Sequence, residues 1–451
     1  MEAAETQTTG SLLEQLTQAL DRGAADSIRQ MLGSLHAAEV ADLLESYPQG
    51  PREILWELVE PDVRGEVLVE VNDEVRAGLI SLMESEQLVA AAEGLDTDDL
   101  ADLIADLPGA VTREVLRSMD KQNLDRLEAV LHYPEDTAGG LMNVDTVTVR
   151  ASVTLDVVLR YLRVHVDIPE TTDKLFVVDR NDVYKGILRL SALLTNDPEL
   201  LVVDVMDRDV QGIPSDMPDD EVARLFEDRN LISAPVVDGN GRLLGRITID
   251  DVVDVIREDA DHSLLSMAGL DEEDDTFAPV LTSARRRAVW LGINLFTAFL
   301  ASWVIGLFQA TLQQVVALAV LMPIVASMGG IAGSQTLIIV IRGLALGQVG
   351  SSNARWLMVK ELAVSALNGI VWSLVVALLA TLWFGDINIG LIIAAALIIN
   401  LVCAAIAGFI IPFTLTRLKI DPAHAGTVVL TTITDVVGFM VFLGLGTIFL
   451  L

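Results

Sequence analysis

The chain has 451 residues, with 30 Lys and Arg against 64 Asp and Glu, and a formal net charge of −34. Such an acidic balance excludes a nucleic-acid-binding protein, because phosphate backbones need a basic surface. Hydrophobic residues nevertheless make up 52% of the chain, and the mean hydropathy is +0.49, which is too high for an acidic soluble protein. Residues 1–287 hold 25 basic and 60 acidic groups, whereas residues 288–451 hold five and four. We therefore predict an acidic soluble half followed by a membrane half.

Two features place the soluble half in a reducing compartment. The only cysteine, Cys403, lies in an apolar run, which excludes a disulfide framework and a cysteine metal site. The N-terminal segment MEAAETQTTG is acidic and polar, unlike a signal or transit peptide. We expect the soluble half to stay in the cytoplasm.

Residues 1–130 are predicted to form short amphipathic helices. The segment ADLLESYP, which begins at Ala41, recurs as ADLIADLP, which begins at Ala101. Repeated helices of about 10–15 residues that end at Pro or Gly are typical of a small helical solenoid.

A strand–turn–strand–helix pattern then occurs twice. The segment FVVD ends at Asp179 and is followed by the turn RND and by GIL from Gly186. The segment PVVD ends at Asp238, 59 residues later, and is followed by the turn GNG and by GRIT from Gly245. The glycines of residues 239–245 lack the spacing of a nucleotide-binding loop, and Asn-Gly is a turn signal, so a hairpin is favoured.

Five apolar segments are long enough to span the hydrocarbon core, which takes about 20 residues. Lys and Arg precede the first segment and lie between the second and third and between the fourth and fifth, while the other two loops have none. The positive-inside rule therefore places the N-terminal half in the cytoplasm and the C-terminus outside. The predicted spans are Val289–Phe308, Val315–Ile341, Leu357–Phe384, Ile389–Ile411 and Val428–Leu450.

Two spans depart from the pattern of a simple anchor. The second contains Pro323 and the run GGIAGSQ of residues 329–335, which would serve close helix packing or a broken helix beside a cavity; on the residues alone, packing is favoured. The fifth contains Asp435, the only ionisable residue expected deep in any span. A carboxylate there usually faces a wet path or a partner, although a site near the helix start would be hydrated from the cytoplasm.

Motifs along nearly the whole chain resemble those of known protein families. The paired repeats resemble a tandem CBS (Bateman) module, and the chain as a whole resembles the MgtE family of magnesium channels. The supporting motifs are YPEDTAGGLM from Tyr133, DDVVDVI from Asp250, MAGL from Met267, Met322-Pro323 with the glycine run, DPA from Asp421, and residues 431–438.

The resemblance implies a fold and a pore. It implies a multidomain α-helical membrane protein: a helical N domain (1–135), tandem CBS domains (136–260), a linking helix (261–287) and a membrane domain (288–451). It also implies a homodimer whose pore is lined by spans two and five of both subunits, with Asp435 holding a largely hydrated Mg²⁺ ion. Other oxygen donors suit an ion that keeps its water; the candidates are Thr427, Thr431, Gly329, Gly330, Gly333 and Gln335.

The resemblance further implies a cytoplasmic magnesium sensor. Mg²⁺ that bridges apposed acidic faces would relieve their repulsion and favour a compact state with a shut pore. The linking helix is expected within residues 261–284, before Arg285. The candidate sensor residues are Glu66, Asp98, Asp102, Asp220, Asp251, Asp254 and Asp259.

Four residues depart from the family pattern. His262, Ser263 and Asn230 replace acids, which implies a sensor that is tuned differently. Ile331 replaces the asparagine of the family's Gly-Gly-Asn run, so cobalt, nickel, manganese or iron(II) stay open as alternative ions.

An enzyme is not expected, because the five histidines are scattered and no P-loop is present. The rival interpretation is a membrane-anchored sensor whose CBS pair binds adenine nucleotide, and ATP is also a possible second input to a transporter. Five spans and an acid within one of them favour transport. Passive and coupled transport both stay open, and the absence of other charges within the spans favours passive flow.

Overall fold

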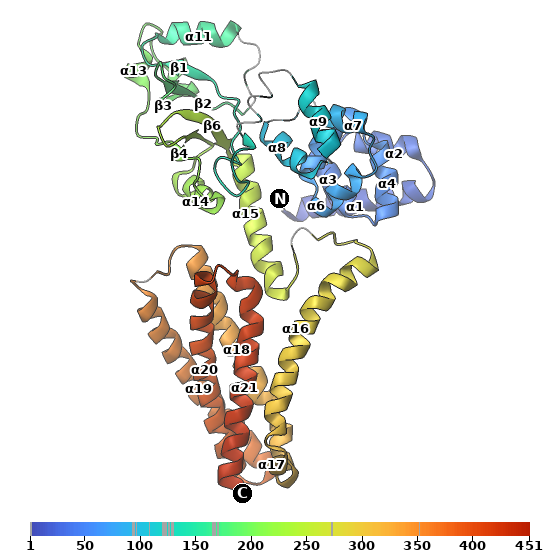
Figure 1. Cartoon of the computed structure of the whole chain (residues 1–451), viewed down its shortest axis with the longest axis vertical. Helices are drawn as coiled ribbons and strands as arrows, with labels where there is room; N and C mark the ends of the chain where they lie inside the picture. The colour runs from blue at the N-terminus through green and yellow to red at the C-terminus, as the bar shows by residue number, and fades with distance from the viewer. Residues whose placement is uncertain are drawn as a thin grey trace. The chain divides into compact units, whose positions relative to one another are not determined.

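The computed structural model describes residues 2–92, 95, 97–107, 109–119, 124, 127, 130–164, 168, 171–271, 274–350 and 352–451. The chain divides into two compact units (Figure 1). The first comprises Met1–Asp261 and Glu273–Pro279, and the second comprises His262–Glu272 and Val280–Leu451.

The first unit begins with a helical domain, as predicted. Apart from the first, its described helices have 10 residues or fewer, and two of them begin with a cap. The Asn72 side chain accepts a hydrogen bond from the Val75 amide (2.9 Å), and the His36 amide donates to the Glu39 carboxylate (3.0 Å). The helices are α1 (Glu2–Asp21), α2 (Ala25–Leu32), α3 (Ala37–Glu45), α4 (Gln49–Leu58), α5 (Arg64–Glu70), α6 (Asp73–Ile80), α7 (Ser85–Ala92), α8 (Thr97–Asp106) and α9 (Gly109–Ser118), with the 3-10 turn η1 (Pro61–Val63). Pro108, at the end of the predicted second repeat, lies outside the described residues.

Two small sheets follow, and each has the same topology. In both, the first strand is parallel to the second and the second is antiparallel to the third. The 59-residue repeat is visible in the register, since Lys174 pairs with Arg189 and Ser233 pairs with Thr248. The first copy has β1 (Thr148–Arg150), α11 (Leu155–Val164), β2 (Lys174–Val178), β3 (Tyr184–Arg189) and α12 (Leu190–Thr195); α13 (Val202–Val205), β4 (Ile213–Pro214), α14 (Asp219–Arg229), β5 (Ser233–Val237), β6 (Leu243–Thr248) and α15 (Ile249–Leu265) follow.

The hairpin turns repeat their chemistry as well as their spacing. The Asp179 carboxylate accepts hydrogen bonds from the amides of Asn181 and Val183, and the Asp238 carboxylate accepts from those of Asn240 and Arg242. These backbone donors lower the pKa of both exposed carboxyls. The predicted turns are therefore confirmed, and neither copy forms a phosphate-binding loop.

Two hydrophobic cores hold the first unit together. One is shared by the helical domain and the second α/β copy, since Leu68, Leu103, Val236 and Val252 belong to the same buried cluster. The other fills the first α/β copy around Leu175, Val177 and Leu188. The acidic ends of α8 and α15 are thus carried by elements that pack on one core.

The linker to the membrane helices differs from the single helix expected within residues 261–284. Helix α15 runs on to Leu265, a 3-10 turn (η2, Ser266–Ala268) follows, and Gly269 ends it with φ +70°. A side chain could not replace this glycine, because an added Cβ would lie 2.3 Å from the Trp290 ring. Helix α16 (Val280–Gly306) already begins before the arginine triplet, because Pro279 precedes it and the next residues can all continue a helix.

The segment before α16 is held by a buried ion pair within the first unit. The Arg52 guanidinium donates to both oxygens of Asp275 (2.7 and 2.9 Å), and its Nε donates to the Leu44 carbonyl (2.8 Å). The Asp275 amide donates to the Glu74 carboxylate (2.8 Å). The two charged side chains are only 7% and 6% exposed.

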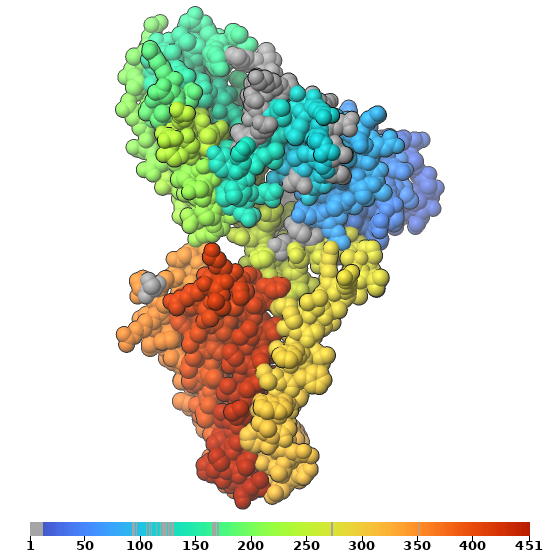
Figure 2. Space-filling view, in the orientation of Figure 1, coloured from blue at the N-terminus to red at the C-terminus, as the bar shows by residue number. Residues whose placement is uncertain are grey.

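Among the described residues of the second unit, five helices are long and apolar enough to cross a membrane, as predicted. They are α16, α18 (Val316–Ala345), α19 (Ala354–Phe384), α20 (Ile387–Arg417) and α21 (Pro422–Leu450), with the short helix α17 (Gln309–Gln314) after α16. Figure 2 shows α21 in red beside α16 in yellow. Helix α20 packs against α18, α19 and α21 and is the most buried of the five.

Helix α18 is continuous through Pro323 and the glycine run, so the glycines do not break it. In lipid an interrupted helix would leave backbone groups without water; within α18 only Pro323, which has no N–H, removes one intrahelical hydrogen bond.

Candidate functional site

Asp435 lies near the middle of α21. The helix begins at Pro422 rather than near Val428, so Asp435 is about 20 Å from its start at 1.5 Å per residue. The carboxylate is half-buried in the single chain. Asp435 therefore does not lie close to the start of α21.

Two hydroxyl groups that precede Asp435 on α21, those of Thr431 and Thr434, are oriented by their own helix. Thr431 donates to the Thr427 carbonyl (2.9 Å), and Thr434 donates to the Thr431 carbonyl (3.0 Å). Each hydroxyl oxygen keeps a lone pair that can accept from the water shell of a cation. Thr431 is exposed and Thr427 is half-buried, whereas Thr434 is fully buried.

The glycine run of α18 has two different faces. Gly329 and Gly333 are buried: an added Cβ would meet the Asn400 amide at 2.2 Å and Leu430 at 2.8 Å, respectively. Gly330 has open space around it, and Gln335 and Ile331 are exposed. The predicted pore residues thus separate into packing positions (Gly329, Gly333) and positions that face outward from the single chain (Gly330, Gln335).

Glu361 and Asn400 are buried polar residues of this unit that the sequence analysis did not single out. Glu361 is 3% exposed; it accepts from the Thr336 hydroxyl (3.3 Å) and pairs with Lys360 (2.8 Å). Glu361 lies seven residues after the start of α19 at Ala354, so it is a second buried ionisable residue of the spans, near the end of one of them. Asn400 is fully buried on α20 and donates to the Val325 carbonyl (2.9 Å). Asn400 could have been found in the sequence, because it is a polar residue in the middle of an apolar run. Glu361 was harder to recognise, because it follows Lys360 near the end of a span and resembles an exposed ion pair.

Two of the predicted sensor acids of the first unit, Asp98 and Asp251, are brought close together. Asp251, in the first turn of α15, has its pKa raised to about 8, chiefly by burial and then by the negative charges of Asp98 and Asp250. Its carboxylate accepts from the amide (3.2 Å) and hydroxyl (3.0 Å) of Thr248. Asp98, from α8, is thus a neighbour of Asp251 across two domains.

Two further acidic groups centre on carboxylates that the sequence analysis did not select. The pKa of Glu70 is raised by burial and by Asp254, with a smaller contribution from Glu66. The pKa of Asp219 is raised by burial and by Asp136, Asp220 and Asp259. In the sequence, Glu70 and Asp219 differ from other acids only in lying close to the selected residues Glu66 and Asp220.

Asp102 has different neighbours from Asp98, although both lie on α8. Burial, followed by the charge of Glu135, raises the pKa of Asp102 to about 6, while Arg76 opposes the shift. Asp220 is paired with Arg224 on its own helix. Among the residues that the structure describes, no three His, Cys, Asp or Glu side chains form a group that could hold a metal ion.

Asn230 and His262, two of the departures noted in the sequence, have defined structural roles. Asn230 ends α14 in the left-handed conformation, with φ +50°, which Asn tolerates better than most residues. The His262 Nε2 lies 3.5 Å from the carboxylate of Asp421, which also caps the start of α21.

The CBS pair contains a polar contact region between its copies. Lys174 donates to the Ser233 carbonyl (2.7 Å), the Ser233 hydroxyl donates to Asp173 (2.6 Å), and Arg246 donates to the Thr171 hydroxyl (2.8 Å). Burial lowers the pKa of Lys174, while Asp173 raises it. The Thr172 hydroxyl and Arg246 Nε are buried without a hydrogen-bond partner in the described structure.

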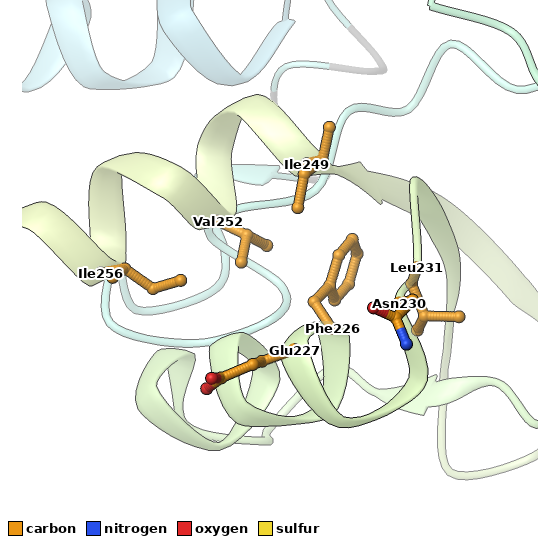
Figure 3. A pocket seen from close by; sticks show the side chains of 7 residues that line it. All are labelled: Phe226, Glu227, Asn230, Leu231, Ile249, Val252 and Ile256. Carbon is orange, nitrogen blue, oxygen red and sulfur yellow. The ribbon is translucent and has the colours of Figure 1, made fainter. Parts of the chain in front are cut away.

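An apolar groove lies between α14 and α15 in the second copy. It has a volume of about 370 Å³, and Figure 3 shows Phe226 at its centre with Ile249, Val252 and Ile256 along one wall. Glu227, Asn230 and Leu231 complete the lining. Ile249 and Ile256 are 40% and 46% exposed, so the groove presents apolar surface to its surroundings.

Comparison with known proteins follows the same division. Three family models match: the MgtE intracellular N domain over residues 35–136, the CBS domain over 202–258, and MgtE, a divalent cation transporter, over 322–445. The chain is 30% identical to the magnesium transporter MgtE of Bacillus subtilis, over 95% of both chains. It is also 30% identical to that of Thermus thermophilus, over 96% of this chain and 98% of the relative.

One solved structure is similar to this chain over about half of its length. The cytosolic domain of the Mg²⁺ channel MgtE in complex with ATP is 32% identical, with a TM-score of 0.49, and covers 54% of this chain and 99% of its own. The family assignment follows from the identity with curated relatives over nearly the whole length. The helical domain, the CBS pair and the five apolar helices agree with it. The chain belongs to the MgtE family, a family of divalent cation transporters and not of enzymes.

Proposed function

We propose that this protein conducts Mg²⁺ into the cytoplasm across the inner membrane and is shut by cytosolic Mg²⁺. The observation that carries the proposal is Asp435, a half-buried carboxylate in the middle of an apolar helix that packs against the glycine run of α18. A carboxylate in that position is retained at a cost of several kcal/mol unless it faces water or a cation.

The donors around Asp435 suit a hydrated Mg²⁺ ion. Mg²⁺ gives up water reluctantly and is commonly bound through one or two carboxylates, with water filling the other positions. Two copies of Asp435 from a homodimer would provide that number. Thr431 and Thr427 precede Asp435 by one and two turns of α21, and Gly330 and Gln335 lie on α18, which packs against α21. We assign these four residues to the water shell.

Ile331 favours one alternative, a related Co²⁺, Ni²⁺ or Mn²⁺ transporter. Its side chain is 57% exposed in the single chain, on the same run as Gly330 and Gln335. The side chain of an isoleucine offers no oxygen to the water shell of an ion. The pathway would then discriminate less well between hydrated Mg²⁺ and other divalent ions.

The acidic pairs support the proposed gate. Burial raises the pKa of Asp251, and the negative charge of Asp98 adds to that shift; neighbouring acids add to the effect of burial at Glu70 and Asp219 in the same way. A divalent ion with its water shell needs only one or two carboxylates, so each pair is a complete candidate site. Ion binding would replace repulsion by attraction and hold the helical domain against the CBS domains.

The groove of Figure 3 supports the homodimer. Its apolar wall, with Ile232 and Val253 nearby at 57% and 54% exposure, is a surface that water solvates poorly. We propose that a second copy of the chain covers it. The arginine-flanked loops support an N-terminal half in the cytoplasm and a C-terminus outside.

A nucleotide input is proposed for the CBS pair. The unpartnered Thr172 hydroxyl and Arg246 Nε are a donor pair between the two copies, and ATP offers acceptors of the right kind. Equilibrium binding of ATP to wild type and to Thr172→Val measures this, and equal binding by both would remove the assignment.

Ion flux into liposomes that contain the full-length protein tests the pore. Asp435→Asn should lower Mg²⁺ flux at least tenfold, because it removes the charge at constant size. The matched control is Asp386→Asn, since Asp386 caps α20 through a hydrogen bond from Asn388 (2.8 Å) that Asn can also accept. Normal flux in Asp435→Asn would reject the pathway.

A further inference from the structure

Asn400 occupies the point where three membrane helices cross. It lies on α20 and is 0% exposed. Its amide nitrogen is 2.2 Å from where a Cβ would stand on Gly329 of α18, and 2.8 Å from where one would stand on Gly438 of α21. The Asn400 side chain therefore fills space that both glycines leave empty.

The amide is bonded at one end only. Its nitrogen donates to the Val325 carbonyl of α18 at 2.9 Å, and since only the nitrogen can donate to a carbonyl, this bond fixes the orientation of the amide. The amide oxygen is buried without a hydrogen-bond partner in the described structure. A leucine of nearly the same size would avoid that loss in an apolar surrounding.

We propose that Asn400 is a positioning residue for the ion pathway. By bonding to Val325 and packing into Gly329 and Gly438, it sets the register of α18 against α21. Gly438 lies one turn after Asp435 on α21, so the same contact sets the height of the Asp435 carboxylate relative to the glycine run. This inference rests on the proposed function, since it presumes that ions pass along α18 and α21.

The surroundings of the glycines also show which of them leave space for Asn400. Gly329 and Gly438 are small because Asn400 needs the space, whereas Gly444, also on α21, has no neighbour within 4 Å of an added Cβ. The requirement for glycine at 329 and 438 should therefore disappear when Asn400 is shortened, and nothing comparable should occur at 444.

Full-length protein in liposomes provides the test, with Mg²⁺ and Co²⁺ flux measured separately over a range of concentrations. Asn400→Leu keeps the size and removes the donor. We expect the Mg²⁺-to-Co²⁺ flux ratio, or the half-saturating Mg²⁺ concentration, to change at least threefold while the melting temperature in detergent stays within a few degrees. An unchanged ratio and half-saturation would overturn the inference and leave Asn400 with a packing role only.

A size exchange tests the packing independently. Gly329→Ala should lower Mg²⁺ flux or folded yield at least tenfold, and Asn400→Ala/Gly329→Ala should regain at least half of that loss; Gly444→Ala should stay within twofold of wild type. Independent, additive losses from the two substitutions would overturn the proposed contact. Loss of flux in Asp435→Asn, with Asn400→Leu unaltered in ratio and half-saturation, would reject this inference alone. Wild-type protein without Mg²⁺ flux would reject the proposed function and this inference with it.

Discussion

The ion pair between Arg52 and Asp275 ties the chain just before α16 to the helical domain, and its loss can be predicted in detail. Arg52→Leu keeps an apolar stem of similar length and removes two hydrogen bonds of 2.7 and 2.9 Å to Asp275. Asp275 would then be left as a buried carboxylate that is 6% exposed. Its remaining hydrogen bond comes from the amide of Phe277 (2.8 Å).

Removing one partner of a buried ion pair costs about 3–5 kcal/mol, because the other charge stays behind without compensation. The segment around Asp275 can relieve this by detaching into water, so the cost should be seen as local opening. At about 1.4 kcal/mol per factor of ten, an effect of about 3 kcal/mol raises local opening by about two orders of magnitude. Arg52→Leu/Asp275→Asn should recover most of the loss, because it removes the stranded charge and keeps an acceptor for Phe277.

Hydrogen exchange of the full-length protein measures this opening directly. The amides of Asp275 and Phe277, which donate to Glu74 and Asp275 respectively, should exchange about a hundredfold faster in Arg52→Leu, by the same conversion. The control is Arg150→Leu, which breaks the exposed pair with Asp182 (3.2 Å) and should cost less than about 1 kcal/mol. Exchange within threefold of wild type in Arg52→Leu would refute the reasoning.

Three further results are expected. Because burial and Asp98 raise the pKa of Asp251 to about 8, the folded protein holds this proton more tightly than the unfolded chain. Without Mg²⁺, the contribution of Asp251 to the free energy of unfolding is greatest at low pH and falls by up to about 1.4 kcal/mol per pH unit between about pH 4 and 8. Free energies of unfolding measured at pH 6 and pH 8 should show that slope, and Asp251→Asn should remove it. Asp98→Asn/Asp251→Asn should raise the internal Mg²⁺ concentration that halves the flux at least threefold, whereas Asp182→Asn, whose residue has φ +59°, should not; equal shifts would argue against a sensor at α8 and α15. Ile331→Asn should increase the Mg²⁺-to-Co²⁺ flux ratio, and a ratio unaffected by it would separate Ile331 from selectivity.

Patterns of period and repetition predicted the architecture well. The 59-residue repeat specified both hairpins because turn and strand signals are local, and Asp179 and Asp238 carry their turn chemistry within four residues. The five apolar runs were likewise sufficient to find α16 and α18–α21. Helix starts were less predictable: α21 begins at Pro422 because Asp421 accepts hydrogen bonds from the amides of Ala423 and His424, a cap that hydropathy does not register.

Contacts between distant segments could not be predicted from one sequence. Nothing local links Asn400 with Gly329 and Gly438, or Arg52 with Asp275, because each depends on how helices cross in three dimensions. The resemblance named Asp98 and Asp251 as separate candidates, and their proximity emerged only from the fold, as did Glu70 and Asp219 at the centre of the other acidic groups. The pKa of an acid depends on its burial and on neighbouring charges, and both are determined by the tertiary structure.

The most direct measurement is Mg²⁺ flux into liposomes that contain the purified full-length protein, with internal Mg²⁺ varied and Co²⁺ as the comparison ion. The account predicts flux that prefers Mg²⁺, needs Asp435 and falls as internal Mg²⁺ rises. Flux that is indifferent to Asp435, or that persists unchanged at high internal Mg²⁺ in wild type, would contradict the pore or the gate, respectively.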